Sequence, residues 1–334
     1  MKTRVAINGF GRIGRNAFKV AFERSDIEIV AVNDTASPAT LAYLLKHDSV
    51  YGAYHHQVSS DPTNIIINGV PVKVLSVSAS AEYPWRDLGV DVVIESGGTE
   101  MTEAALRSHL SQGARRVVAA APVKGVPAII MGSNEESLTK DMELVSASSC
   151  VGVCAVPVLS AIDASFGVNQ VSIASVHSYT AQQNLIDGPA ITLREARAAA
   201  LNIVPRTVTD DAGISDVLAP LTGKIQFASY SVPTQVVSLV DMTIQVQKGT
   251  NAEEVNQALS TAAAEPYYQG ILSVSEEELV SSDYIGNSHS AVVDARMTQV
   301  VDGTSVRVVA WHDNEWGYAN RLVEIVSDFG KLLQ

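Results

Sequence analysis

A glycine motif directly after the first strand pattern constrains this chain more than any other feature. The strand pattern 4–8 is followed by G-x-G-x-x-G at 9–14, and a helical pattern then continues to about residue 24. A second strand pattern, 27–33, ends at Asp34, twenty residues after Gly14. This strand–turn–helix–strand order is the fingerprint of a Rossmann dinucleotide-binding domain, in which the glycines let the backbone approach a pyrophosphate at a helix N-terminus.

The motif predicts which residues bind the dinucleotide. They are Gly9, Phe10, Gly11, Arg12, Ile13, Gly14 and Asp34. The Asp34 carboxylate would accept hydrogen bonds from the adenosine ribose and repel a 2′-phosphate, which favours NAD over NADP. The alternative interpretation is a tight turn followed by a surface aspartate.

The remaining pattern divides the chain into two parts. In the first part we expect strands at 92–95, 116–120 and 143–146, helices from Pro38 and at 102–112, and a hairpin at 65–72 with Asn68-Gly69 as its turn. In the second part we expect strands at 171–180, 235–247, 291–300 and 305–312, with helices at 251–264 and 316–333. The fold class is therefore α/β: a Rossmann domain at 1–149, completed by the C-terminal helix 316–334, and an α+β catalytic domain at 150–315 with a mostly antiparallel sheet.

Composition excludes several classes of function. The formal net charge is −13, from 23 Lys and Arg against 36 Asp and Glu, which argues against nucleic acid or an anionic membrane as a partner. Two cysteines in 334 residues exclude a disulfide-stapled scaffold. With no apolar run long enough to span a bilayer and no signal-peptide pattern, we expect a cytoplasmic protein.

Cys150 is the candidate nucleophile. It follows a strand pattern and opens an apolar helical stretch, where the positive end of the helix dipole stabilises a thiolate. Cys154 lies one turn further along, and two buried structural cysteines are the alternative reading. No metal site is expected, since the chain has no other cysteine. A base would have to come from elsewhere in the chain, and His177, within a strand pattern, is the best candidate.

These residues, in this order, resemble the phosphorylating glyceraldehyde-3-phosphate dehydrogenase family over essentially the whole chain. The matching stretches are A-I-N-G-F-G-R-I-G-R at 6–15, L-L-K at 44–46 with D-S at 48–49, A-P at 121–122 with K-G at 124–125, A-R-A-A-A at 196–200 and W-H-D-N-E-W-G-Y-A-N at 311–320. The resemblance implies that Cys150 attacks an aldehyde to form a thiohemiacetal while His177 accepts the proton. Hydride transfer to NAD then leaves a thioester. It also implies that Asn314 fixes the nicotinamide carboxamide, that phosphate releases the acyl group, and that the enzyme is a homotetramer whose loop 180–197 reaches a neighbouring subunit.

The phosphate-binding positions depart from the family pattern. At the inorganic-phosphate site, two threonines are replaced by Val151 and Val208, and an arginine is replaced by Glu195. At the site for the substrate's own phosphate, Thr180 is retained, but an aspartate falls on Gln182 and an arginine on Ser231. An adenine-stacking arginine falls on Ser78, and a Leu-Pro pair on Gly188-Pro189. The residues expected to contact the substrate are Ser149, Thr180, Arg194, Arg197, Thr209 and Ser231.

Three interpretations follow from these departures. The first is an NAD-dependent dehydrogenase of a small-molecule aldehyde that lacks phosphate or bears it differently, with water as the acyl acceptor and Glu195 as a candidate base. The second is ordinary glyceraldehyde-3-phosphate dehydrogenase activity, retained because Arg194, Arg197 or Arg206 replaces the lost cations. The third is a non-catalytic NAD-binding paralogue with a regulatory role. Thr35 after Asp34 and the space left by Gly188 keep NADP open as an alternative cofactor.

Overall fold

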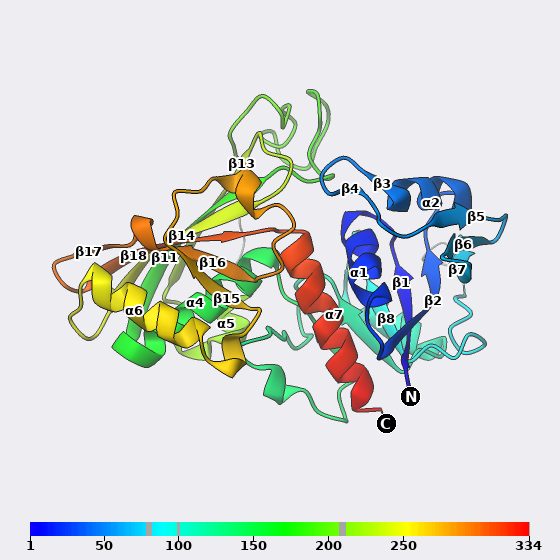
Figure 1. Cartoon of the computed structure of the whole chain (residues 1–334), viewed down its shortest axis with the longest axis horizontal. Coiled ribbons are helices and arrows are strands. Elements are labelled where there is room, and N and C mark those ends of the chain that lie inside the picture. The colour runs from blue at the N-terminus through cyan, green and yellow to red at the C-terminus, as the bar shows by residue number, and fades with distance from the viewer. Residues whose placement is uncertain (78–81, 99–100, 207–211, 334) are drawn as a thin grey trace. The chain divides into compact units, whose positions relative to one another are not determined.

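The computed structural model describes residues 1–77, 82–98, 101–206 and 212–333. The chain forms two units, each with its own dense set of internal contacts (Figure 1). The first unit comprises Met1–Ser148 and Ala319–Gln334, and the second comprises Ser149–Tyr318.

The first unit is built on an eight-stranded sheet in the order β10-β9-β8-β1-β2-β7-β6-β5. Its strands are β1 (Thr3–Asn8), β2 (Ile27–Asn33), β5 (Val58–Ser60), β6 (Asn64–Ile67), β7 (Val70–Leu75), β8 (Val92–Glu95), β9 (Arg116–Ala119) and β10 (Leu144–Ser146). Strands β10 to β7 pair in parallel, whereas β7, β6 and β5 are antiparallel. The predicted hairpin is confirmed, with Asn68 and Gly69 at φ of 50° and 83° in its two-residue turn. A separate small ladder joins β3 (His47–Asp48) and β4 (Gly52–Ala53).

The helices of the first unit begin where the sequence provides caps. Helix α2 (Pro38–Lys46) is capped by the Ser37 hydroxyl and has proline in its first position, and α3 (Glu103–Ser111) is capped by Thr102. Helix α1 (Arg12–Phe22) follows β1 directly. The last helix of the chain is α7 (Trp316–Lys331).

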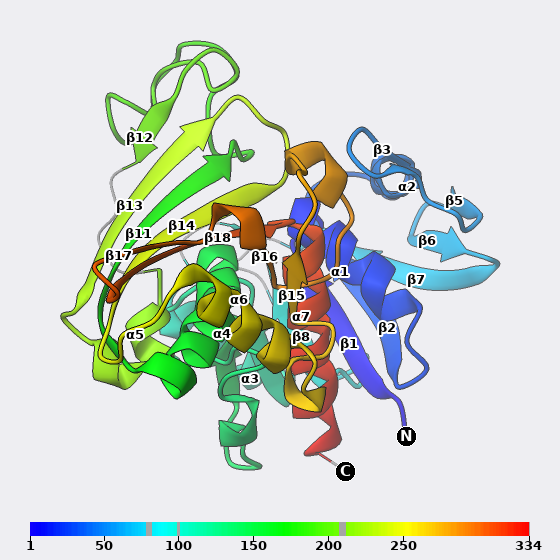
Figure 2. The ribbon, with the colours of Figure 1, turned by 60° about the vertical axis from the view of Figure 1, so that its left-hand side comes forward.

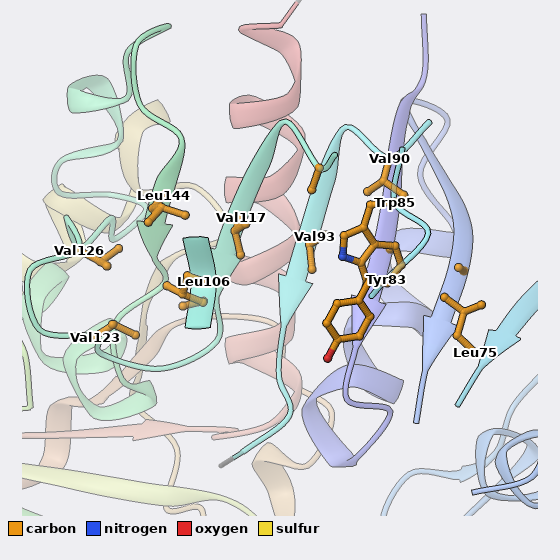
Figure 3. Close-up of a cluster of buried hydrophobic side chains, with 14 residues drawn as sticks. Leu75, Tyr83, Trp85, Val90, Val93, Leu106, Val117, Val123, Val126 and Leu144 are labelled. Carbon is orange, nitrogen blue, oxygen red and sulfur yellow. The ribbon is translucent and has the colours of Figure 1, made fainter. Parts of the chain in front are cut away.

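A buried cluster lies on one side of this parallel sheet and includes Tyr83, Trp85 and Val93 (Figure 3). The rings of Tyr83 and Trp85 stack with their centroids 5.0 Å apart. The Trp85 indole donates to Nδ1 of His109, and the other ring nitrogen of His109 lies 2.9 Å from the Glu95 carboxylate. His109 is therefore a packing residue whose two nitrogens are both satisfied, as buried polar groups require.

The second unit contains a seven-stranded path in the order β12-β13-β11-β14-β18-β16-β15, with β17 paired to β18. Its strands are β11 (Val168–Ser178), β12 (Val204–Arg206), β13 (Ile225–Val232), β14 (Ser238–Val246), β15 (Leu272–Ser275), β16 (Ala291–Asp294), β17 (Gln299–Val301) and β18 (Ser305–His312). The long strands β11, β13 and β14 run side by side (Figure 2). Pairing is mostly antiparallel, with parallel pairs at β11–β13 and β15–β16.

Helix α4 (Cys150–Phe166) packs against strands β11, β14, β16 and β18 and against α6 (Ala252–Ala263), and α5 (Ile214–Val217) is a single turn. Short 3₁₀ turns complete the chain: η1 (Glu135–Ser137), η2 (Ala219–Leu221), η3 (Pro266–Tyr268), η4 (Ser281–Tyr284) and η5 (Ala295–Met297). Because α4 packs on the sheet, its N-terminus lies at the end of β11, where His177 sits.

One strand expected in this unit was wrong, and further strands were not expected. The single strand expected at 291–300 is broken after Asp294, whose carboxylate accepts the backbone N–H of Arg296 and starts the turn η5. Strands β12, β13 and β15 were not anticipated. Most residues of β13 are only partly exposed and its one buried residue is Ser231, so its sequence lacks a regular apolar face.

Among the described residues, no helix has both the length and the apolar character needed to cross a membrane.

Candidate active site

Cys150 and His177 face each other across the start of α4. The Cys150 sulfur lies 3.4 Å from Nε2 of His177. Nδ1 of His177 lies 2.6 Å from the carbonyl oxygen of Ser178, which can only accept, so Nδ1 carries the proton. Nε2 therefore presents its lone pair to the thiol, which is the arrangement of a nucleophile and its general base.

Opposing effects set the ionisation of this pair. Burial raises the pKa of the Cys150 thiol to about 11, while the backbone N–H groups of Val151 and Cys150 and the charge of Arg206 lower it. Desolvation therefore affects the pKa of Cys150 more than the helix N-terminus does, although the sequence led us to expect a stabilised thiolate. Burial also lowers the pKa of His177, and Arg206 lowers it further. At neutral pH the resting pair is a thiol beside a neutral imidazole, ready to transfer its proton as the sulfur attacks.

Cys154 does not share this chemistry. Its side chain is fully buried, and burial raises its pKa well above the usual range of a thiol. It packs within α4 as an apolar residue.

The amide of Asn314 is held by two serines. Its Oδ1 accepts hydrogen bonds from the hydroxyls of Ser178, at 3.1 Å, and Ser238, at 3.3 Å. These bonds fix which end of the amide is the acceptor, so Nδ2 remains as a donor for a ligand. Within the described residues, no side chain or carbonyl accepts a hydrogen bond from this Nδ2.

Ser149 has a structural task at this site. Its Oγ accepts the backbone N–H of Gly152 and so caps α4, and it donates to the carbonyl of Ala212 at 2.8 Å. Val151, which follows the nucleophile, is buried and offers only apolar atoms where the family pattern has a threonine.

Three neutral residues are joined where the family pattern places the substrate's phosphate. Gln183 accepts the backbone N–H of Thr180 through Oε1 and donates through Nε2 to the hydroxyl of Ser231. Ser231 is buried and pairs with His177 across β13 and β11, so both side chains lie on one face of the sheet. The hydroxyl of Thr180 is buried and has no partner among the described residues.

The charged residues between positions 180 and 206 differ in their contacts and exposure. Arg197 is exposed and pairs with Asp187 at 3.0 Å, and Arg194 is exposed as well. Arg206 is largely buried, and its Nε lies 3.7 Å from Oε1 of Glu195. Of these charged residues, Arg206 is the one whose charge acts on the pKa values of both Cys150 and His177. Gln182 is exposed. Ser78, Val208 and Thr209 lie outside the described residues.

Sequence reasoning named Arg206 only as one of three compensating cations and missed two neighbours of the site. Gln183 had no signal, because its role depends on contacts with residues far along the chain. His312 is buried, and its ring centroid lies 6.4 Å from that of His177. Burial, together with His177, lowers the pKa of His312 to about 3, so its ring is neutral. Its Nε2 has no partner in the part of the chain that the structure describes.

The glycine motif forms a tight turn between β1 and α1. A Cβ at Gly14 would overlap the carbonyl oxygen of Gly9, so the third glycine is needed for close packing of strand and helix. A Cβ at Gly11 would meet nothing within 4 Å, and no side chain caps α1 at this residue. A helix N-terminus without a side-chain cap and the open space at Gly11 fit a bound pyrophosphate.

Asp34 is tied to this turn. Its carboxylate accepts the backbone N–H groups of Phe10 and Ala36, each at 3.0 Å, which fixes it at the end of β2 beside the glycines. The Arg12 side chain pairs with buried Asp48 at 2.8 Å, so only its backbone belongs to the turn. Ile13 lies in the first turn of α1.

One cluster of metal-ligand types occurs among the described residues, formed by Glu23, His55 and His56. Nε2 of His56 lies 2.6 Å from the Glu23 carboxylate, and Nδ1 lies 2.9 Å from Nδ2 of Asn68. Oδ1 of Asn68 accepts the backbone N–H of Gln57, so the amide donates to Nδ1 and the proton of His56 lies on Nε2. That proton is donated to Glu23, and the cluster is explained by hydrogen bonding.

The chain is similar to known proteins over nearly its whole length. The family model described as the glyceraldehyde 3-phosphate dehydrogenase NAD-binding domain matches residues 3–103, and the model of the C-terminal domain matches residues 149–314. A glyceraldehyde-3-phosphate dehydrogenase of Geobacillus stearothermophilus is 42% identical over 329 residues, covering 98% of each chain. The enzyme of Borreliella burgdorferi is 40% identical over 335 residues, covering 98% of this chain and 100% of the relative.

Proposed function

Because the chain belongs to the glyceraldehyde-3-phosphate dehydrogenase family, we propose that it oxidises an aldehyde without a phosphate group, using NAD, through a thioester on Cys150. Membership of the family makes the protein an NAD-dependent oxidoreductase. The proposal concerns its substrate and its acyl acceptor, which the altered phosphate-binding positions bring into question.

The reactive pair performs the first step. As the Cys150 sulfur bonds to the aldehyde carbon, the thiol proton passes to Nε2 of His177, 3.4 Å away, and from there to the former carbonyl oxygen, so that a neutral thiohemiacetal forms and Nε2 is free again. His177 then accepts the proton of the thiohemiacetal hydroxyl as hydride leaves the same carbon, and a thioester remains. With water as the acceptor, the balanced reaction converts aldehyde, NAD⁺ and water into carboxylate, NADH and two protons.

Each unit, taken by itself, contains residues that suit one part of the cofactor. The turn of Gly9, Gly11 and Gly14 leaves the N-terminus of α1 without a side-chain cap, which suits a pyrophosphate, and Asp34 stands beside this turn for the ribose. Nδ2 of Asn314 remains as a donor for the nicotinamide carboxamide. When bound, NAD⁺ supplies the hydride acceptor.

The single observation that carries the substrate proposal is the link from Thr180 through Gln183 to Ser231. A phosphate dianion needs cationic or multiple unpaired donors, and replacing one charge-assisted partner costs roughly 1.5–3 kcal/mol. Here the arginine position is a buried serine whose hydroxyl already accepts from Gln183. Neutral polar groups of this kind suit a hydroxyl or an unsubstituted end of an aldehyde.

The acyl acceptor is the second part of the proposal. Glu195 stands where the family pattern has a phosphate-binding arginine, and its carboxylate repels inorganic phosphate. We therefore infer water as the acceptor, with Glu195 as the candidate base. The alternative, genuine phosphorylating activity, is supported by one observation, the largely buried Arg206 beside Glu195. A non-catalytic role is disfavoured by the intact geometry of Cys150, His177 and Asn314.

Assembly and location are extensions of the same proposal. We infer a homotetramer in the cytoplasm. The large exposed apolar residues of the loop region are Leu185, Ile186, Ile191, Leu193, Leu201 and Ile203, each at least 69% exposed in the single chain. Apolar surface of this extent is typical of a subunit interface. Light scattering coupled to gel filtration measures the mass directly, and a monomer at micromolar concentration would contradict the inference.

The decisive experiment follows NADH formation at 340 nm with and without inorganic phosphate. We expect turnover of phosphate-free aldehydes that does not depend on inorganic phosphate, and slow turnover of glyceraldehyde 3-phosphate. Rapid, phosphate-dependent oxidation of glyceraldehyde 3-phosphate would contradict the proposal and favour the alternative. The Cys150→Ser variant is the control, because it removes the nucleophile and must abolish the signal.

A further inference from the structure

Arg206 lies on the same face of the sheet as the catalytic base. Strand β13 lies between β12 and β11. Its residue Ser231 pairs with Val204 of β12 and with His177 of β11. Arg206, two residues after Val204, pairs with Ser229. Residues paired across strands, and residues two apart on one strand, share a face. Arg206 and His177 are separated by two strand spacings across the sheet and by two residues along the strand, so their Cα atoms are about 12 Å apart. A short substrate attached to Cys150 can bridge the space that the arginine side chain leaves.

Most hydrogen-bond donors of the Arg206 guanidinium have no acceptor among the described residues. Within the described ranges its one ionic contact is with Oε1 of Glu195, at 3.7 Å, which is beyond hydrogen-bond distance. The other oxygen of Glu195 is held by the hydroxyl of Thr192 at 3.1 Å, and the same hydroxyl accepts the N–H of Glu195. Glu195 is therefore kept from forming a bidentate pair, and the two terminal nitrogens of Arg206 remain available as a fork of donors.

The charge of Arg206 reaches the reactive pair. It lowers the pKa of Cys150 and that of His177, and its side chain is only 28% exposed, so solvent screens it weakly. This is the behaviour of a cation inside the active site rather than on its rim.

The neighbouring Glu195 selects the kind of anion that fits. Arg206 and Glu195 together carry no net charge, so a phosphate dianion gains attraction from one and meets repulsion from the other. A carboxylate carries a single charge and matches the planar guanidinium fork in a bidentate way. Elsewhere in the site, the linked residues Thr180, Gln183 and Ser231 offer no charge that would compete for it.

We propose that Arg206 binds a carboxylate carried by the substrate, so that the enzyme oxidises a short oxo acid, an aldehyde with a carboxylate at its far end. This inference rests on the proposed function, in that the substrate lacks phosphate. It makes Arg206 a specificity-determining residue that contacts substrate, and Glu195 the residue that disfavours dianions.

The test compares two matched substrates, 4-oxobutanoate and butanal, which differ in the terminal carboxylate. We expect kcat/KM to be at least tenfold higher for 4-oxobutanoate, and we expect Arg206→Met to reduce this ratio at least tenfold, mainly through KM. The ratio cancels any change in the reactivity of Cys150. The control is Arg296→Met, which removes an exposed arginine paired with Glu278 in the same unit and should leave the ratio unchanged. Arg206→Lys keeps the charge without the fork and should give an intermediate ratio.

A binding measurement supports the kinetic one without requiring turnover. Butanoate should protect Cys150 from iodoacetamide, 1-butanol should not, and Arg206→Met should abolish the protection. Equal kcat/KM for the two aldehydes in every variant, with no protection by butanoate, would overturn the inference while leaving phosphate-independent oxidation of butanal intact. A KM for inorganic phosphate that rises in Arg206→Met, with glyceraldehyde 3-phosphate as the best substrate, would overturn both this inference and the proposed function.

Discussion

At the scale of single residues, the site depends on one imidazole lone pair. His177 has its Nδ1 proton committed to the Ser178 carbonyl, so Nε2 alone serves Cys150. We predict that His177→Asn lowers kcat by about 10²–10⁴-fold, the usual contribution of a positioned general base. Stopped-flow measurement of NADH formation tests this, and a loss of less than threefold would show that another group accepts the proton.

The charge of Arg206 leads to a prediction about how the reactivity of Cys150 depends on pH. Its positive charge lowers the pKa of Cys150 and of His177. Removing it in Arg206→Met therefore raises both values, so less thiolate is present at any given pH. We predict that the alkylation rate of Cys150 by iodoacetamide rises with pH in both proteins and that its rising limb lies at higher pH in the variant. An unshifted or acid-shifted limb would place Arg206 away from the thiol.

The dinucleotide turn and the nucleophile were proposed from local sequence, because the turn joins a strand pattern to a helix pattern and Cys150 follows a strand pattern and opens a helix. His177 lies within a strand pattern, and its role as the base rested on the resemblance to the family. The contacts of Gln183, His312 and Arg206 could not be predicted in this way. They depend on pairing between segments tens of residues apart: Gln183 meets Ser231 across 48 positions of chain. Desolvation of Cys150 had no local signal either, since it arises from packing of the whole second unit rather than from the helix that Cys150 begins.

At the scale of elements, two glycines in the turn between β1 and α1 have different roles, one in packing and the other in ligand binding. A Cβ at Gly14 would overlap the Gly9 carbonyl, whereas a Cβ at Gly11 would enter open space. We predict that Gly14→Ala destabilises the protein by about 1–3 kcal/mol through overpacking. Gly11→Ala should cost at most about 1 kcal/mol yet weaken NAD binding, because the methyl group occupies the approach of the pyrophosphate.

Thermal unfolding and NAD titration of the two variants measure these effects separately. Equal NAD affinity in Gly11→Ala and the parent protein would show that the pyrophosphate does not lie against this residue. Gly52→Ala is a control at a positive-φ glycine with open surroundings outside the turn, and it should leave NAD affinity unchanged.

Most elements were predictable because their signals are local. Ser37-Pro38 and Thr102 mark helix starts, and Asn68-Gly69 marks the hairpin. Strand β13 was missed because its parallel partner β11 is supplied by tertiary structure and its own pattern is only half-buried. The turn η5 was missed because the Asp294 carboxylate accepts a local backbone N–H, which ends the strand that was expected to continue to residue 300.

At the scale of the whole molecule, the end of the chain is built into the first unit. Arg116 is buried, donates to the carbonyls of Phe329 and Lys140, and lies over the Phe329 ring with its guanidinium 4.2 Å from the centroid. Burial lowers the pKa of this arginine, which records the cost of desolvating the charge. The two hydrogen bonds offset this cost, because the carbonyls at the end of α7 and before β10 would otherwise lose their donor.

We predict that Arg116→Met destabilises the protein by about 2–4 kcal/mol, since it removes the donor to the buried Phe329 carbonyl and the contact with the Phe329 ring. The matched control is Arg115→Met: Arg115 is the exposed neighbour that pairs with Asp91 at 3.3 Å, and its loss should change stability by less than about 1 kcal/mol. NAD at a hundredfold excess over its dissociation constant adds about 2.7 kcal/mol to any state that binds it. If Arg116 acts only on stability, NAD raises the unfolding midpoint of the variant as it does that of the parent. A midpoint that no longer responds to NAD would mean that the end of the chain also shapes the dinucleotide turn.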